Sequence, residues 1–175
     1  HLVYQDHVTE GAGDGGGQRV AYSSTSISDQ YRVVFARFLE EAAVARSFEM
    51  LPLADANNDP AKQITDVTTL HRHGVEGIFI VVLDSEAIKP ALDRAEAAGV
   101  PVVAVDQGPL AGKVAITVRG DSVLEGRQAC EAIGERMGGT GKVLELQGDL
   151  AGVIGVQRSK GFNDWMAEDF PGIGV

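Results

Sequence analysis

Residues 77–83 read GIFIVVL, an unbroken apolar run in a chain of 175 residues. A run of this kind is typical of a strand that is buried on both faces, as in a parallel sheet. Further strand patterns lie at 20–24 and 48–54 before it, and at 101–105 and 115–118 after it. The sequence therefore predicts five strands in this part of the chain.

Helical patterns separate these strands. Residues 29–46 place apolar side chains three and four positions apart, as on one face of a helix. Asp59 is predicted to cap a helix that begins at Pro60. A third helix ends at Gly99, and Pro90 is tolerated there only in the first turn. This alternation predicts an α/β fold with a doubly wound parallel sheet and right-handed crossovers.

A second α/β unit is predicted to follow. Ser122 and Glu125 have the spacing of a capping box at the start of a helix. A strand is expected at 143–146, a helix at 155–169 and the beginning of another strand at 172–175. One strand and a short second one cannot bury both faces of a sheet, so we expect another chain or a missing segment to complete it.

Three segments follow from these patterns. Residues 18–121 are predicted to form an N-terminal α/β lobe, and residues 122–175 the incomplete start of a C-terminal α/β lobe. Residues 1–17 contain five glycines and no helix or strand period, which predicts a flexible tether. A hinge between the lobes is expected near residues 120–121.

Composition and charge narrow the class of function. The formal net charge of −10 at pH 7 disfavours binding to nucleic acid phosphates. Cys130 is the single cysteine, so no internal disulfide can form, and its helical context predicts a buried side chain. No apolar run reaches 18 residues, so no membrane span is expected. The chain begins without Met or a leader, so we expect any signal peptide to be absent from this sequence.

No catalytic or metal site is predicted. Asp55, Asn57 and Asp59 imitate the start of a calcium loop, but Pro60 occupies the position that needs glycine. The histidines at 71 and 73 are two residues apart on a helix and do not share a face. No nucleophile elbow is present, and no glycine-rich phosphate loop follows the first strand. We therefore expect a protein that is not an enzyme and that needs no cofactor.

Polar side chains gather just after the predicted strands, where open α/β sheets bind their ligands. These residues are rich in Asp, Ser, Gln and Arg and include one tyrosine. They lie at 23–32, 84–85, 106–107 and 147–149. Carboxylates and guanidiniums make paired hydrogen bonds to neighbouring hydroxyls, and an aromatic ring packs on the apolar face of a sugar. The set predicts a polyhydroxylated ligand, although each residue alone is explained equally well as a helix cap or loop residue.

Several stretches carry a specific resemblance. YSSTSISDQYR, ADANNDPAKQ, VVLDSEA, GVPVVAVDQG, GDSVLEGRQA, GKVLELQGDLAG and QRSKGF occur in this order over roughly residues 18–175. Together they resemble the ribose- and galactose-type sugar-binding proteins of bacterial ABC importers, a group of type I periplasmic binding proteins. The resemblance implies two α/β lobes that close on a sugar or polyol, and a membrane permease that accepts the closed form.

The same resemblance implies six ligand-binding positions: Asp29, Tyr31, Arg32, Asp106, Gln107 and Arg158. Gln107 stands where the family commonly has an arginine, and Arg32 where it commonly has a second aromatic residue. These departures leave the identity of the sugar open. The resemblance also implies a periplasmic or extracellular location. A lipoprotein anchored to the membrane through a segment before His1 is one form that such a protein takes.

Two other classes of function stay open at this point. The effector domain of a lac-repressor-like transcription regulator has the same fold, but it would carry a helix-turn-helix before the first strand, where this chain has glycines. A doubly wound nucleotide-dependent enzyme would need a phosphate loop after that strand. Solute binding is the function that the residues favour most.

Overall fold

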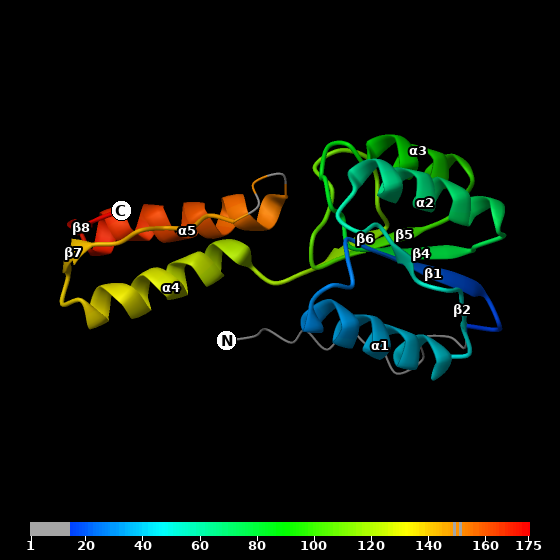
Figure 1. Cartoon of the computed structure of the whole chain (residues 1–175), viewed down its shortest axis with the longest axis horizontal. Helices are drawn as coiled ribbons and strands as arrows, with labels where there is room; N and C mark the ends of the chain where they lie inside the picture. The colour runs from blue at the N-terminus through cyan, green and yellow to red at the C-terminus, as the bar shows by residue number, and fades with distance from the viewer. Residues whose placement is uncertain (1–14, 149, 151) are drawn as a thin grey trace.

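The computed structural model describes residues 15–148, 150 and 152–175, which form two units side by side (Figure 1). The first unit contains β1 (Arg19–Ser24), α1 (Gln30–Val44), β2 (Glu49–Met50), β3 (Ala54–Asp55), α2 (Pro60–Arg72), β4 (Gly77–Ile80), α3 (Lys89–Ala97), β5 (Val102–Val105) and β6 (Ile116–Val118). The second contains α4 (Ser122–Arg136), β7 (Thr140–Lys142), α5 (Val153–Asp169) and β8 (Gly172–Gly174).

The first unit is built on a parallel sheet with the strand order β2-β1-β4-β5-β6, in which β3 also pairs with β1. Every pairing in this sheet is parallel. Helix α1 lies on one face of the sheet, and α2 and α3 lie on the other (Figure 1). The predicted doubly wound α/β fold is therefore confirmed.

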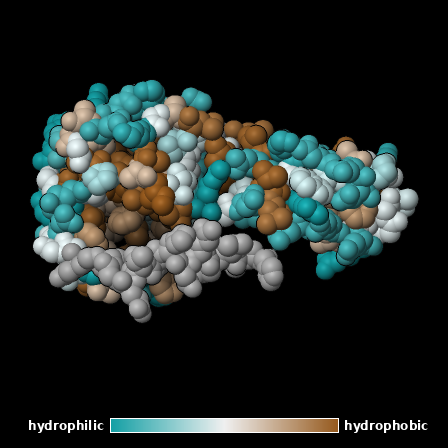
Figure 2. Space-filling model, turned by 180° about the vertical axis from the view of Figure 1, so that it is seen from behind, coloured by the Kyte–Doolittle hydropathy of each residue, from teal (hydrophilic) through white to brown (hydrophobic). Residues whose placement is uncertain are grey.

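The main core lies between the sheet and the α2–α3 layer. Ile78 and Ile80 of β4 and Leu92 of α3 are almost fully buried within it. The other face of the sheet is less well covered, because Phe79 is only half-buried and the side chains of β6 are exposed. Within GIFIVVL the strand β4 ends at Ile80, and only the face that carries Ile78 and Ile80 is fully buried along it. Val81 and Val82 are also buried but lie after the end of the strand, so the expected strand buried on both faces is confirmed only in part. In the view from behind, apolar surface gathers in a hollow of the first unit (Figure 2).

The start of α2 follows the sequence. The Asp59 carboxylate accepts hydrogen bonds from the backbone N–H groups of Ala61 and Lys62, with Pro60 in the first turn of α2.

The single strand expected at 48–54 is instead two short strands, β2 and β3. Pro52 lies between them and has no backbone N–H to donate to the sheet.

The second unit is a pair of packed helices with a two-stranded parallel sheet at one end. Its small core is formed by Cys130, Phe162, Met166 and Ile173. Cys130 is fully buried, as predicted, and burial raises the pKa of its thiol. This unit has its own buried core, so its helices are ordered without a complete sheet beneath them.

Two predictions for the second unit are wrong. The N-cap of α4 is Asp121 rather than Ser122, because the Asp121 carboxylate accepts hydrogen bonds from the N–H groups of residues 123 and 124. The strand expected at 143–146 is replaced by β7, which ends at Lys142. Leu144 and Leu146 are 84% and 87% exposed. A strand there would need a partner to pair with, and β8, the only strand that pairs with β7 in the described part of the chain, ends at Gly174.

The start of the chain is described only from Gly15. Of the tether expected at 1–17, residues 1–14 lie outside the described residues. Gly15 and Gly17 are held against the loop after α1, since their N–H groups donate to the carbonyl oxygens of Arg46 and Ser47 at 2.7 and 2.8 Å. The expected tether therefore does not include Gly15 or Gly17.

Candidate functional site

A cavity of about 800 Å³ lies where the two units meet. It is lined by residues from the strand ends of the first unit and from α4, α5 and the segment before α5 in the second: Tyr31, Arg32, Asp106, Gln107, Gly120, Glu125, Glu145, Leu146, Gln147, Gly148, Ile154, Gly155, Arg158 and Ser159. Five of the six residues singled out from the sequence, all except Asp29, therefore share one cavity.

The ion pair between Arg32 and Asp106 forms the first-unit wall. Nη1 of Arg32 lies 3.0 Å from Oδ2 of Asp106, and the two side chains are 16% and 27% exposed. Within the described residues, Nη1 is buried and has no acceptor in hydrogen-bonding geometry. The contact is thus a charge pairing between two partly buried side chains.

The backbone of Asp106 is strained. Its φ of 63° lies in the left-handed region, which non-glycine residues occupy at a cost of about 1–3 kcal/mol. Hydrogen bonds on both sides hold this conformation: Asp106 N–H donates to the Val118 carbonyl, and Gln107 N–H to the Val105 carbonyl. The sheet therefore fixes the carboxylate at the cavity against a local backbone preference, as is common at binding sites.

Tyr31 supplies the aromatic surface. Its side chain is 57% exposed, its ring lies 6.3 Å from that of Phe35, and the Arg32 guanidinium stands 5.3 Å above it. Burial, followed by the nearby charge of Asp106, raises the pKa of the Tyr31 phenol. The hydroxyl is therefore neutral at physiological pH and can both donate and accept a hydrogen bond.

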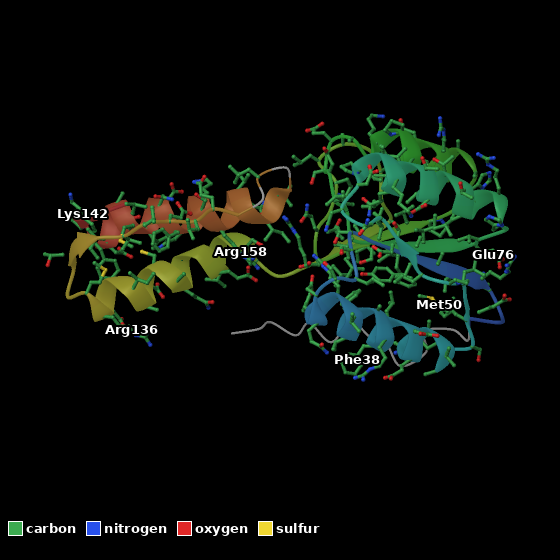
Figure 3. All side chains as sticks on the ribbon, in the orientation of Figure 1. Phe38, Met50, Glu76, Arg136, Lys142 and Arg158 are labelled. Carbon is green, nitrogen blue, oxygen red and sulfur yellow. The ribbon has the colours of Figure 1, made fainter. Side chains whose placement is uncertain are left out.

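Arg158 comes from the second unit and lies between α4 and α5 (Figure 3). Its Nε donates to Oε2 of Glu125 at 2.7 Å. Sequence reasoning assigned Glu125 to a capping box, but the structure directs its carboxylate across to α5. The position of Glu125 in the cavity wall was not predicted, because it depends on how two helices cross.

Gln107 connects the two units. Its side-chain amide donates to the Leu83 carbonyl at 3.4 Å. The same amide packs directly on Gly152 of the second unit. The contact is so close that a Cβ atom placed on Gly152 would lie 2.0 Å from Nε2 of Gln107, so no side chain fits there. Arg119 makes a second bridge, because its Nη1 donates to Oε1 of Gln157 at 3.0 Å. Side chains from both units thus meet directly at the cavity.

Asp29 does not line the cavity. Its Oδ1 accepts a hydrogen bond from the backbone N–H of Arg32 at 2.8 Å and so caps α1. This contact places Arg32 in the first turn of the helix, facing Asp106. A direct contact between Asp29 and a ligand stays a prediction.

Gln63 is a supporting residue that the sequence did not single out. It is 1% exposed and holds the segment that follows β4: Nε2 donates to the Val81 carbonyl at 2.8 Å, and Oε1 accepts from the Leu83 N–H at 2.9 Å. The carbonyl of Leu83 in turn accepts from the cavity residue Gln107, so Gln63 supports the cavity wall indirectly. A glutamine at a helical position gave no signal of this role, since its partners lie about twenty residues away.

The comparisons with known proteins bear on what such a cavity binds. Residues 20–175 match the family model for the periplasmic binding protein domain. The chain belongs to the periplasmic binding protein family.

Several relatives are informative. The chain is 33% identical over 145 residues to a ribose import binding protein of Bacillus subtilis, covering 83% of this chain and 47% of that protein. It is 32% identical over 120 residues to a xylitol-binding protein of Mycolicibacterium smegmatis, covering 69% of this chain and 34% of the relative. An ABC transporter solute binding protein from Mycobacterium smegmatis, solved with bound glycerol, superposes with a TM-score of 0.85 at 30% identity, covering 91% of this chain and 55% of that one.

This family member therefore spans half or less of the length of these curated relatives. The relatives are binding proteins for sugars and polyols, which agrees with the polar cavity. No described helix is long and apolar enough to cross a membrane. Among the described residues, no group of three or more His, Cys, Asp and Glu side chains is arranged to hold a metal ion.

Proposed function

We propose that this chain is part of an extracytoplasmic solute-binding protein that captures a sugar or polyol in the cavity between its two units and delivers it to an ABC importer. The observation that carries the proposal is the pairing of Asp106 with Arg32 beside Tyr31, facing Arg158 across the cavity. Carboxylate and guanidinium groups together satisfy the donors and acceptors of vicinal hydroxyls, and the tyrosine ring offers an apolar face.

Capture in such a site works by differential affinity. A ligand that contacts both walls stabilises the arrangement in which the units are close, relative to one in which they are apart. The connection through Gly120 and Asp121 is the place where the units can move, because a single segment of the described residues joins them there (Figure 1). Two of the named relatives are an import binding protein and an ABC transporter solute binding protein, which supports import over a role as a regulator's effector domain.

The proposal is tested by titration calorimetry on the full-length natural protein with neutral sugars and polyols, including D-ribose, xylitol and myo-inositol. Asp106→Asn keeps a side chain that tolerates positive φ but removes the charge, and it should weaken binding of the best ligand by about tenfold or more, since a charged hydrogen bond contributes about 1.5–3 kcal/mol.

Asp93→Asn is the matched control. It removes a carboxylate from an exposed ion pair with Lys89 on α3, outside the cavity, and affinity should be unchanged. Equal affinity of the Asp106→Asn variant and the wild type would remove Asp106 from the site. Absence of binding to every neutral sugar and polyol would overturn the proposed function.

A further inference from the structure

The cavity has a distinctive balance of charge. Its described wall carries two guanidiniums, Arg32 and Arg158, and three carboxylates, Asp106, Glu125 and Glu145. Each guanidinium already has a carboxylate beside it, at 3.0 Å for Arg32 and 2.7 Å for Arg158. Glu145 accepts a hydrogen bond from the neutral Asn163 amide at 2.8 Å and has no ion pair among the described residues. Within the part of the wall that the structure describes, each positive charge is therefore paired and one negative charge is in excess.

Glu125 is placed beside Arg158 by the backbones of two helices. Helices α4 and α5 touch at Gly126 and Gly161, where an added Cβ would lie 2.0 Å from the carbonyl oxygen of Arg158 or of Val123. No other residue type allows this approach, which brings the residue before Gly126 next to Arg158.

The other carboxylate oxygen of Glu125 lies beside Gly120. An added Cβ on Gly120 would lie 2.8 Å from Oε1, so this glycine leaves the space that the carboxylate occupies at the junction between the units. The position of the Glu125–Arg158 pair thus follows from the close approach of the two helix backbones, with Gly120 leaving room for the carboxylate.

We propose that Glu125 is a specificity-determining residue: by neutralising Arg158, it restricts the cavity to uncharged polyols and excludes sugars that carry a carboxylate or phosphate. This inference rests on the proposed sugar-binding function. An unpaired arginine is the group that best recognises carboxylates and phosphates, through two parallel hydrogen bonds. With Glu125 in place, an anionic sugar meets a guanidinium whose charge is already paired and a wall with excess negative charge, which selects against it.

The pair's role in stability is small, because its side chains are 55% and 42% exposed and ion pairs at such positions contribute little. A change at Glu125 is therefore expected to alter which ligands bind while leaving the fold intact. This separates a role in specificity from a structural role.

The test compares Glu125→Gln with Glu131→Gln in the full-length natural protein. Glu131 is a matched control, because it lies on the same helix and pairs with Arg127 at 2.7 Å at similar exposure, but neither residue lines the cavity. Calorimetric titrations use D-galactose against D-galacturonate, and D-ribose against D-ribose 5-phosphate.

The wild type should bind the better neutral sugar at least about tenfold more tightly than its anionic counterpart, since a tenfold ratio needs only about 1.4 kcal/mol. Glu125→Gln should reduce that ratio by about tenfold, because the anion binds more tightly once Arg158 is no longer neutralised. Glu131→Gln should keep the wild-type ratio.

Other results would overturn the inference. Equal binding of neutral and anionic sugars by the wild type, or the same change in both variants, would show that Glu125 does not set the selectivity while leaving sugar binding in place. Tighter binding of the anionic sugars by the wild type would contradict it directly. Failure of every sugar to bind would instead refute the proposed function on which the inference rests.

Discussion

Replacing Gln63 by leucine should destabilise the first unit by about 2–3 kcal/mol. The side chain is 1% exposed, and its amide satisfies the Val81 carbonyl and the Leu83 N–H. Leucine is similar in size but satisfies neither group. Each unpaired backbone group costs about 1–3 kcal/mol, and the added apolar burial offsets about 1–2 kcal/mol of the sum.

The assay is urea unfolding followed by far-ultraviolet circular dichroism. Gln128→Leu is the control, because Gln128 lies on the exposed side of α4 and its replacement should change stability by less than about 0.5 kcal/mol. If Gln63→Leu were as stable as the wild type, the two hydrogen bonds could not be what holds the segment after β4 in place. The reasoning about how the first-unit wall is supported would then be refuted.

Three further outcomes are expected. Tyr31→Ala should weaken binding of the best polyol by about tenfold with little change in Tm, whereas Phe38→Ala, equally exposed on α1 and likewise stacked by an arginine, should leave affinity unchanged in the same titration. Gly126→Ala should lower the stability of the second unit by about 1–3 kcal/mol in urea unfolding, because its Cβ meets the α5 backbone; a stabilised variant would argue against the close crossing. The exposed Leu144 and Leu146 should exchange their amide protons rapidly in this chain, and strong protection with a monomeric mass by light scattering would contradict their exposure.

The first unit could be predicted in detail because its signals are local. Strand and helix patterns alternate over short stretches, and Asp59 with Pro60 marks a helix start that needs no distant partner. The strand at 48–54 was predicted as one element because its apolar pattern is continuous. Pro52 divides it, since a residue without an N–H interrupts the hydrogen-bond ladder.

The second unit was harder to predict because its features depend on partners distant in sequence. Either Asp121 or Ser122 could cap α4, and only the backbone geometry selects Asp121. The stretch at 143–146 has a strand's composition, but a strand also needs neighbours to pair with. Glu125 reaches Arg158 across 33 residues of sequence, through a helix crossing that no local pattern encodes.

The candidate site was predicted from where polar residues follow strands. That reasoning brings Tyr31, Arg32, Asp106 and Gln107 to one sheet edge, because parallel strands all end there. Asp29, like Tyr31 and Arg32, follows β1, but its carboxylate caps α1 and does not line the cavity. Position after a strand therefore predicts proximity to the cavity, while the direction of each side chain depends on local hydrogen bonds.

The most direct test of the account is a crystal structure of the full-length natural protein with its tightest-binding neutral polyol. The account predicts a ligand between the two units, with hydroxyls within hydrogen-bonding distance of Asp106 and Arg158 and a face of the molecule against Tyr31. A ligand bound elsewhere, for example in the groove lined by Thr68 and Arg94 between α2 and α3, would contradict it.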